Sequence, residues 1–340
     1  MLHTFIKTLC TSVILCTAPL AAQAQQIGMQ DITFTAEHHG ASPITGELCY
    51  PTLDTGPFDI VSQNKVFQGV EVLKNATLPE GKHPTILLSH GMGGGAKTMS
   101  WLAAQMAERG AIVISVNHIN SYFMAFDPVK NWQHWTRAQD LSAALDHLLA
   151  DDTIAPLIDL DHISAVGFSY GEWTALPLGG ARLSLDGYLA NCDAYGDVAT
   201  PCARIIDNPQ VITPKLWNAS YRDPRVRAVV AIDPGAVWGL RADLLEDVPE
   251  ATTLIALGNE QTQMSATDVD KSGLSALLPN ARVERFEKAV HFTAMPLCTK
   301  IGRLILAATF DDSVCTDPKG TDRAQVHDQI ATIVAQTIGL

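Results

Sequence analysis

Short apolar runs alternate with amphipathic segments from about residue 85 onward. Residues 85–89, 111–116 and 163–168 are continuous apolar stretches, which are typical of strands buried on both faces. Residues 98–109 and 137–149 between them have helical spacing, and another helix begins at residue 172 and extends to about 181. Strands that alternate with helices predict a parallel sheet covered on both faces.

The alternation stops between residues 182 and 222 and then resumes. The interrupting segment is rich in Asn, Asp, Gly and Pro, so we interpret it as an insertion after a helix. It either caps a site or is a surface excursion, and the sequence leaves both open. After it we expect strands at 228–232, 253–257 and 283–286 and helices at 269–278 and 325–338. Residues 30–80 have the pattern of irregular β structure.

The first 24 residues have the pattern of a secretory signal peptide. Residues 1–7 carry one lysine and no acid, residues 8–20 are largely apolar, and Ala22-Gln23-Ala24 supplies small residues for cleavage near Ala24. The apolar part is shorter than the roughly 20 residues of a membrane span. We therefore expect a secreted or periplasmic protein, with residues 25–340 forming one catalytic domain that is not stably inserted in a membrane.

The charge balance of the chain is strongly acidic. The full sequence has 23 Lys and Arg against 36 Asp and Glu, a net charge of −13. Removal of the signal takes away Lys7 and no acid, which leaves 22 − 36 = −14. A chain this acidic is not expected to bind nucleic acid or anionic membranes through non-specific attraction. The sequence does not indicate an oligomeric state.

Cys49 and four other cysteines remain after the signal is removed. An oxidising compartment permits disulfides, and pairing of neighbours predicts Cys192–Cys202 and Cys298–Cys315, with Cys49 free. Other pairings stay open, because sequence alone does not fix connectivity. Neither C-x-x-C nor H-E-x-x-H occurs in the chain, so the motifs of a zinc site are not present.

Ser169 is the candidate nucleophile. It lies in Gly167-Phe168-Ser169-Tyr170-Gly171, a G-x-S-x-G motif between an expected strand and an expected helix. In a nucleophile elbow the serine occupies a sharp strand-to-helix turn, where a Cβ two residues before or after it would clash. The alternative, a structural Gly-Ser turn, does not require this strand–turn–helix context.

A serine hydroxyl needs a base, and the base needs an orienting acid. The histidines that follow Ser169 are His291 and His327. His291 follows an expected strand in a loop and is the candidate base. His327 lies among charged residues in an expected helix, which suits a solvent-facing position.

Two acidic residues at strand ends are candidates for the acid that orients the histidine. Asp233 ends the apolar run 228–232, and Glu260 follows the run 253–257. Both positions suit a site at the carboxyl ends of parallel strands. We favour Asp233, because packing gives no reason for an acid at the end of that buried strand, but Glu260 stays open.

The glycine-rich loop after the first apolar run predicts an oxyanion hole. It reads Ser89-His90-Gly91-Met92-Gly93-Gly94-Gly95, and we expect the backbone N–H groups of Met92 and Tyr170 to stabilise the tetrahedral intermediate. The same loop also fits the dinucleotide-binding pattern G-x-G-x-x-A. That alternative expects an acid at the end of the next strand, where the chain has Asn117-His118.

These motifs together resemble the predicted dienelactone hydrolases and the platelet-activating-factor acetylhydrolase-like α/β hydrolases, over roughly residues 44–300. The resemblance rests on the glycine-rich loop, on residues 135–146, on the serine motif, on Ala231-Ile232-Asp233-Pro234 and on Val290-His291-Phe292. It implies an α/β-hydrolase fold and a serine carboxylic-ester hydrolase without metal or organic cofactor. It also implies Asp233 as the acid and Met92 as an oxyanion donor. Glu172 departs from the glycine that many members have there.

The expected reaction is therefore hydrolysis of a small-molecule or lipid ester through an acyl-enzyme on Ser169. An acyltransferase with the same three residues is one alternative, and a non-catalytic binding module on this scaffold is another. The sequence does not choose among short esters, lactones, phospholipids and polyesters.

Overall fold

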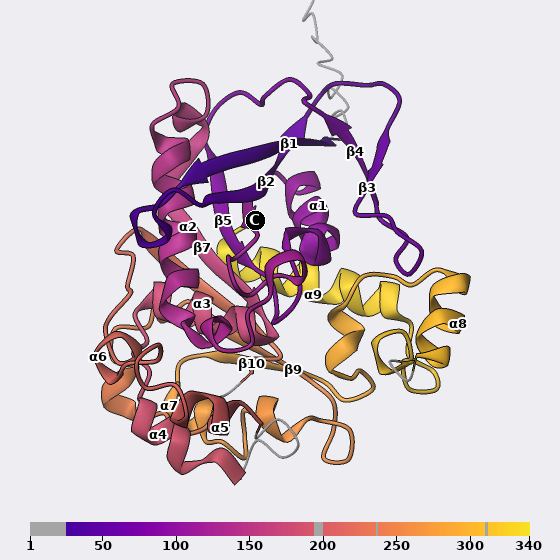
Figure 1. Ribbon diagram of the computed structural model, residues 1–340. Helices are drawn as coiled ribbons and strands as arrows, with labels where there is room; N and C mark the ends of the chain where they lie inside the picture. The colour runs from indigo at the N-terminus through magenta and orange to yellow at the C-terminus, as the bar shows by residue number, and fades with distance from the viewer. Residues whose placement is uncertain (1–24, 194–199, 236, 310–311) are drawn as a thin grey trace, which may run out of the picture.

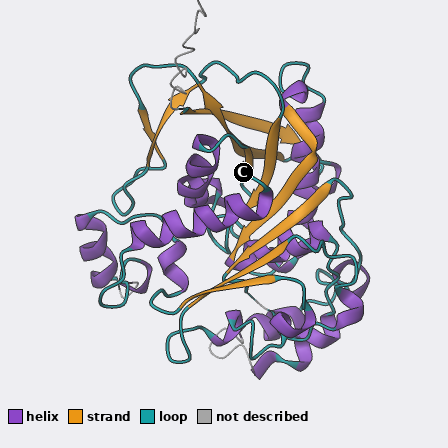
Figure 2. Cartoon of the chain, turned by 180° about the vertical axis from the view of Figure 1, so that it is seen from behind, coloured by secondary structure: helices purple, strands orange, loops and turns teal. Residues whose placement is uncertain are grey.

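A computed structural model describes residues 25–193, 200–235, 237–309 and 312–340, so the expected signal peptide lies outside the described residues. The described chain forms one ten-stranded sheet in the order β10-β9-β8-β7-β5-β6-β2-β1-β4-β3. Strands β6, β5, β7, β8, β9 and β10 run parallel to one another. Helices cover both faces of this sheet (Figures 1 and 2). The predicted doubly wound α/β-hydrolase architecture is confirmed.

The elements of the described chain follow the alternation expected from the sequence. The strands are β1 Gln26–Thr35, β2 Pro43–Thr52, β3 Asp59–Val61, β4 Val70–Lys74, β5 His83–Ser89, β6 Ile112–Val116, β7 Ile158–Phe168, β8 Val226–Ile232, β9 Thr252–Leu257 and β10 Arg282–Phe286. The α-helices are α1 Ser100–Glu108, α2 His134–Leu149, α3 Glu172–Gly179, α4 Leu185–Ala190, α5 Thr200–Ile206, α6 Pro214–Trp217, α7 Leu274–Leu277, α8 Lys300–Ala308 and α9 Arg323–Ile338.

The N-terminal β region is more regular than the sequence led us to expect. Strands β1 and β2 form a ten-residue antiparallel pair, and β2 continues the sheet by pairing antiparallel with β6. Alternation of buried and exposed residues in β1 is broken near its start, which explains why its pattern looked irregular. The 3₁₀ turn Glu37–His39 (η1) connects the two strands.

Two apolar layers hold the helices against the sheet. On one face, Leu141 and Leu145 of α2 and Leu176 of α3 are fully buried against strand residues. On the other face, α1 and α9 pack together over the same strands, with Leu102 and Ile330 buried. Strands β6, β8 and β9 are buried along nearly all their length, as expected for parallel strands covered on both sides.

The segment 182–222 contributes α4, α5 and α6 and packs on an aromatic cluster that includes Trp173, Tyr188 and Trp217. Disulfide Cys192–Cys202 lies in this segment, disulfide Cys298–Cys315 joins the region of α8 to the chain before α9, and Cys49 is free and buried. Helix α7 is shorter than the predicted helix 269–278. No helix in the described part of the chain combines the length and apolar character needed to cross a bilayer.

Candidate active site

Ser169 lies at the turn between β7 and α3. Its φ of +57° is in the left-handed region, which costs a non-glycine residue energy and is commonly found at functional sites. A Cβ at Gly167 would overlap the backbone of Gly171, and a Cβ at Gly171 would overlap the last carbonyl of β5. Only glycine fits at either position, as the elbow interpretation requires.

Asp233 and His291 are brought together at the ends of β8 and β10. Oδ2 of Asp233 lies 2.5 Å from Nδ1 of His291, and Oδ1 of Asp233 accepts the backbone N–H of Leu257 at 2.8 Å. The aspartate is fully buried, and its φ of +43° is again in the left-handed region. Both carboxylate oxygens therefore have partners, and the imidazole orientation is fixed from its Nδ1 side.

A cavity of about 680 Å³ has both Ser169 and His291 in its wall. The ring of His291 stacks on that of Phe168, with centroids 4.9 Å apart. The wall has an apolar part made by Phe67, Phe123, Phe168, Phe292, Met295 and Val314, and a polar part made by Ser62, Gln63, Asn64, Lys97 and Thr98. Phe123, from the 3₁₀ turn Phe123–Ala125, is part of this wall. Trp132 and Trp135 are instead buried in the aromatic cluster.

The glycine-rich loop lies directly against the serine. A Cβ on Gly91 would be 3.2 Å from the Cβ of Ser169, and Met92 lines the cavity and is 39% exposed. The loop is held by hydrogen bonds from the N–H of Gly93 to the carbonyl of Ser121, at 2.9 Å, and from the N–H of Gly94 to that of Gly91, at 3.1 Å. The loop therefore has a fixed shape beside the hydroxyl.

Arg137 of α2 anchors the glycine-rich loop through hydrogen bonds. Its guanidinium donates to Ser89 Oγ at 3.1 Å, to Ser121 Oγ at 2.5 Å and to the carbonyl of His90. It also lies 4.8 Å from the ring centroid of Tyr170. Burial lowers the pKa of this arginine to about 10, so it stays charged at neutral pH and keeps these bonds.

A second Ser–His–Asp arrangement lies beneath the same loop, and the sequence analysis missed it. Ser89 Oγ is 3.0 Å from Nε2 of His118, and His118 Nδ1 is 2.9 Å from Oδ2 of Asp140. All three side chains are fully buried, and Ser89 is also bonded to Arg137. Because no substrate could reach this serine, the arrangement supports the loop rather than the chemistry. Asn117-His118 at the end of a buried strand was its only signal in the sequence.

Buried ionisable groups surround the elbow. Burial raises the pKa of the Tyr170 hydroxyl, which donates to the carbonyl of Asn131 at 2.9 Å. Burial also raises the pKa of Glu172 well above its ordinary value, and within the described residues neither of its carboxylate oxygens has a hydrogen-bond partner. Burial therefore favours the neutral form of Glu172, the residue at the start of α3 that departs from the family pattern.

Glu260 and His327, the other acid and histidine considered from the sequence, do not line the cavity around Ser169. Glu260 is exposed and lines a separate cavity with Asp270 and Arg285. His327 is buried, which corrects our expectation that it faces solvent. Its ring stacks on Trp101 of α1 at 3.8 Å, and its Nε2 lies 2.9 Å from the carbonyl of Thr293. Packing of α1 against α9 buries this ring. The charged residues next to His327 in the sequence do not predict this packing.

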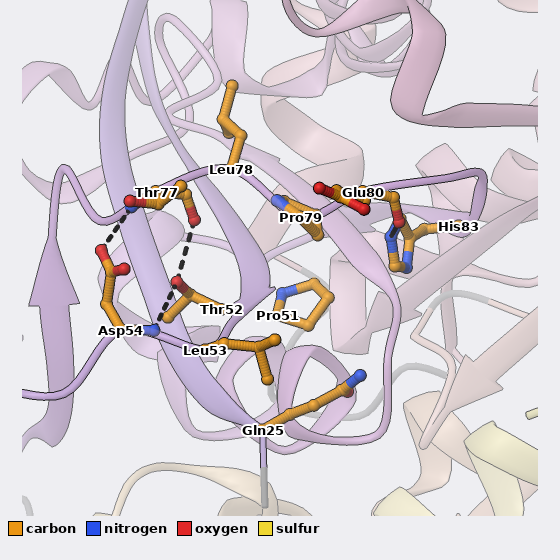
Figure 3. A pocket seen from close by; sticks show the side chains of 10 residues that line it. All are labelled: Gln25, Pro51, Thr52, Leu53, Asp54, Thr77, Leu78, Pro79, Glu80 and His83. Atoms are coloured by element: carbon orange, nitrogen blue, oxygen red, sulfur yellow. Dashed lines mark hydrogen bonds between the residues drawn. The ribbon is translucent and has the colours of Figure 1, made fainter. Parts of the chain in front are cut away.

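A further cavity of about 310 Å³ lies beside the N-terminal β region (Figure 3). Its walls are tied together by bonds from the Thr52 hydroxyl to the carbonyl of Thr77, at 2.9 Å, and from the N–H of Thr77 to Asp54, at 2.6 Å. It contains none of the candidate residues of the elbow. The chemistry expected from the sequence therefore points to the cavity around Ser169.

The fold and the serine elbow define an α/β hydrolase, and comparison with known proteins narrows the class. Residues 65–142 match the family described as platelet-activating factor acetylhydrolase, isoform II. Lipase 1 of Moraxella sp. (strain TA144) is 29% identical over 198 residues. That alignment covers 54% of this chain, and the chain spans only 58% of the length of the lipase.

Two solved structures share the fold. A ferulic acid esterase from Streptomyces cinnamoneus aligns with a TM-score of 0.53 at 14% identity, covering 94% of this chain and 92% of the esterase. A dienelactone hydrolase-like promiscuous phosphotriesterase from metagenomic libraries gives 0.50 at 14% identity, over 92% and 99% of the two chains. The chain thus resembles the platelet-activating-factor acetylhydrolase-like and dienelactone hydrolase-like α/β hydrolases, as its motifs led us to expect. The matched family segment includes the glycine-rich loop and ends before Ser169.

Proposed function

We propose that this protein is an exported serine hydrolase that cleaves carboxylic esters through an acyl-enzyme on Ser169. The observation that carries the proposal is that buried Asp233 contacts His291 and that His291 and Ser169 line the same cavity. The positive φ at both Ser169 and Asp233 supports it, because such strain tends to persist where function requires it. The similarity to a lipase supports the ester class.

In the proposed reaction, the N–H at Nδ1 of His291 donates a hydrogen bond to the Asp233 carboxylate, which leaves Nε2 free to accept a proton. Nε2 takes the proton of the Ser169 hydroxyl as Oγ attacks the ester carbonyl carbon. The N–H groups of Met92 and Tyr170 stabilise the oxyanion, each at a typical worth of about 3–4 kcal/mol. Collapse of this intermediate breaks the ester bond, and the leaving alkoxide takes the proton from His291. Water repeats the sequence and releases the acid.

The cavity wall favours substrates with an apolar acyl or alcohol group. Phe67, Phe123, Phe292 and Met295 present aromatic and thioether surface, and burial of such surface contributes about 25 cal/mol per Å². The two disulfides suit an oxidising compartment, which supports export by the N-terminal signal. The proposal covers both small-molecule and lipid esters.

A chain-length series of p-nitrophenyl esters tests the proposal. We expect turnover by the wild type, loss of at least about 10³-fold in Ser169→Ala and in His291→Gln, and no change in the exposed control His162→Gln. Turnover of no ester in the series would favour the binding-module alternative. Transfer to an added alcohol in preference to water would favour the acyltransferase.

A further inference from the structure

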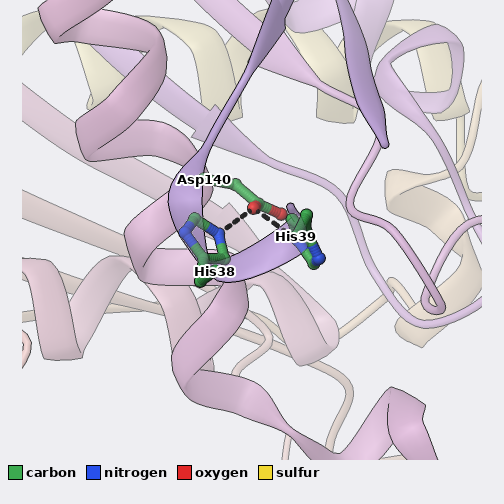
Figure 4. Close-up of side chains that lie close together, drawn as sticks. All are labelled: His38, His39 and Asp140. Atoms are coloured by element: carbon green, nitrogen blue, oxygen red, sulfur yellow. Dashed lines mark hydrogen bonds and ion pairs between the residues drawn. The ribbon is translucent and has the colours of Figure 1, made fainter. Parts of the chain in front are cut away.

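A cluster of three side chains lies outside the candidate active site, between the N-terminal β region and α2. His38 and His39 come from the turn η1, and Asp140 comes from α2, about a hundred residues later (Figure 4). Nε2 of His38 is 2.7 Å and Nε2 of His39 is 2.9 Å from the same oxygen, Oδ1 of Asp140. Two imidazoles therefore converge on one carboxylate oxygen.

We propose that His38, His39 and Asp140 bind a divalent transition-metal ion, with Zn²⁺ as the expected occupant. Two imidazole nitrogens and one carboxylate oxygen form a common three-ligand set for zinc, with water in the fourth position. The three ligand atoms lie within 4.8 Å of one another. The carboxylate oxygen and nitrogen ligands favour zinc over calcium or magnesium, which prefer oxygen alone.

Binding would require the three ligand atoms, which lie within 4.8 Å of one another, to move to tetrahedral spacing. Zinc bonds of about 2.0–2.1 Å in a tetrahedral site place neighbouring ligand atoms roughly 3.3 Å apart. The observed separations of 2.7 and 2.9 Å would thus open by about half an ångström on binding. Each neutral imidazole would then carry its proton on Nδ1 instead of Nε2. The two rings are neighbours, with centroids 4.4 Å apart.

The surroundings of Asp140 match those of a metal-ligating carboxylate. Its other oxygen, Oδ2, is held by Nδ1 of His118 at 2.9 Å, and metal-ligating groups are usually fixed by such outer hydrogen bonds. Asp140 is fully buried, while the side chain of His38 is 17% exposed. The site therefore has a rigid inner wall and an outer side that solvent can approach.

This site has no zinc motif in the sequence because its ligands come from two distant segments. An ion there would join η1 to α2, and α2 carries Arg137, which fastens the loop beside Ser169. Binding would stabilise this part of the fold whether or not the protein hydrolyses esters. The proposal of a metal site and the proposal of ester hydrolysis can therefore be refuted separately.

Calorimetric titration of the chelator-treated mature chain with Zn²⁺ tests the proposal. We expect wild type to bind one ion at this site and to rise in Tm when Zn²⁺ is added. The variants His38→Gln and His39→Gln keep a donor for Asp140 but lose the imidazole, and each should weaken binding at least about tenfold. His162→Gln is the matched control, because exposed His162 also contacts an aspartate, Asp159, at 2.8 Å. Its affinity should equal that of wild type.

Circular dichroism without metal establishes that the variants are folded before they are compared. A visible absorption spectrum with Co²⁺ in place of Zn²⁺ reports nitrogen and oxygen ligation directly. This spectrum should be lost in the double variant that combines His38→Gln with His39→Gln. Failure of wild type to bind Zn²⁺ would overturn the proposal. An unchanged affinity and cobalt spectrum in the folded double variant would overturn it equally.

Discussion

Replacement of Asp233 by asparagine tests the orientation of the candidate base most sharply. In the wild type, Oδ1 of Asp233 accepts the N–H of Leu257 at 2.8 Å, and Oδ2 faces Nδ1 of His291 at 2.5 Å. An asparagine in this buried site must keep its carbonyl oxygen toward Leu257. Its NH₂ group then points at Nδ1 of His291, which has to become an acceptor.

The imidazole in Asp233→Asn therefore carries its proton on Nε2 and cannot take the proton of Ser169. The acid-to-amide change in serine-protease triads lowers kcat about 10⁴-fold. This corresponds to about 5.4 kcal/mol, at roughly 1.36 kcal/mol for each factor of ten. KM should change little, because Asp233 is buried behind the imidazole and does not line the cavity.

The assay is steady-state hydrolysis of the best ester from the chain-length series, with thermal unfolding to check the fold. Glu260→Gln is the control, because this acid is exposed and lines another cavity. It should retain wild-type kcat. A folded Asp233→Asn enzyme with kcat within tenfold of wild type would refute the reasoning, as would a comparable loss in Glu260→Gln.

Three further predictions concern stability. Gly171→Ala should destabilise the fold by about 1–3 kcal/mol and reduce activity, measured by urea unfolding and ester turnover, because its Cβ overlaps the end of β5; equal stability to wild type would contradict the elbow geometry. In the variant that combines Cys298→Ser with Cys315→Ser, the free energy of unfolding should fall by about 3 kcal/mol in the same assay, because the substitutions open a loop of 17 residues. An unchanged unfolding midpoint would show that the disulfide does not form. Burial lowers the pKa of His327 to about 4 in the folded state. Between pH 6.5 and 4 the unfolded chain therefore binds more protons at this histidine than the folded chain does. The contribution of neutral His327 to the free energy of unfolding is present above pH 6.5 and is lost as the pH falls toward 4. The fall in the unfolding free energy from pH 7 to pH 5 should therefore be smaller in His327→Gln than in wild type or His162→Gln, and equal slopes would contradict it.

The sheet and the elbow could be predicted because their signals are local. Residues 163–171 contain an apolar run, two glycines and a serine at fixed spacing, and backbone crowding at Gly167 and Gly171 gives that spacing a physical cause. The strands β6, β8 and β9 were equally clear, since burial on both faces requires an unbroken apolar run.

The features that escaped prediction depend on partners distant in sequence. His327 looked exposed from its charged neighbours, yet it packs on Trp101 of another helix. The contacts of Asp140 with His38, His39 and His118 join segments that no local pattern connects. Helix α7 was overestimated for a related reason, because apolar residues at helical spacing also occur in loops that pack on the core.

Mapping of a fluorophosphonate adduct tests the central claim most directly, because the chain contains two Ser–His–Asp candidates and only one can react. The account predicts a single adduct on the peptide that contains Ser169, with no labelling of Ser169→Ala. An adduct on Ser89, or undiminished labelling of Ser169→Ala, would contradict it.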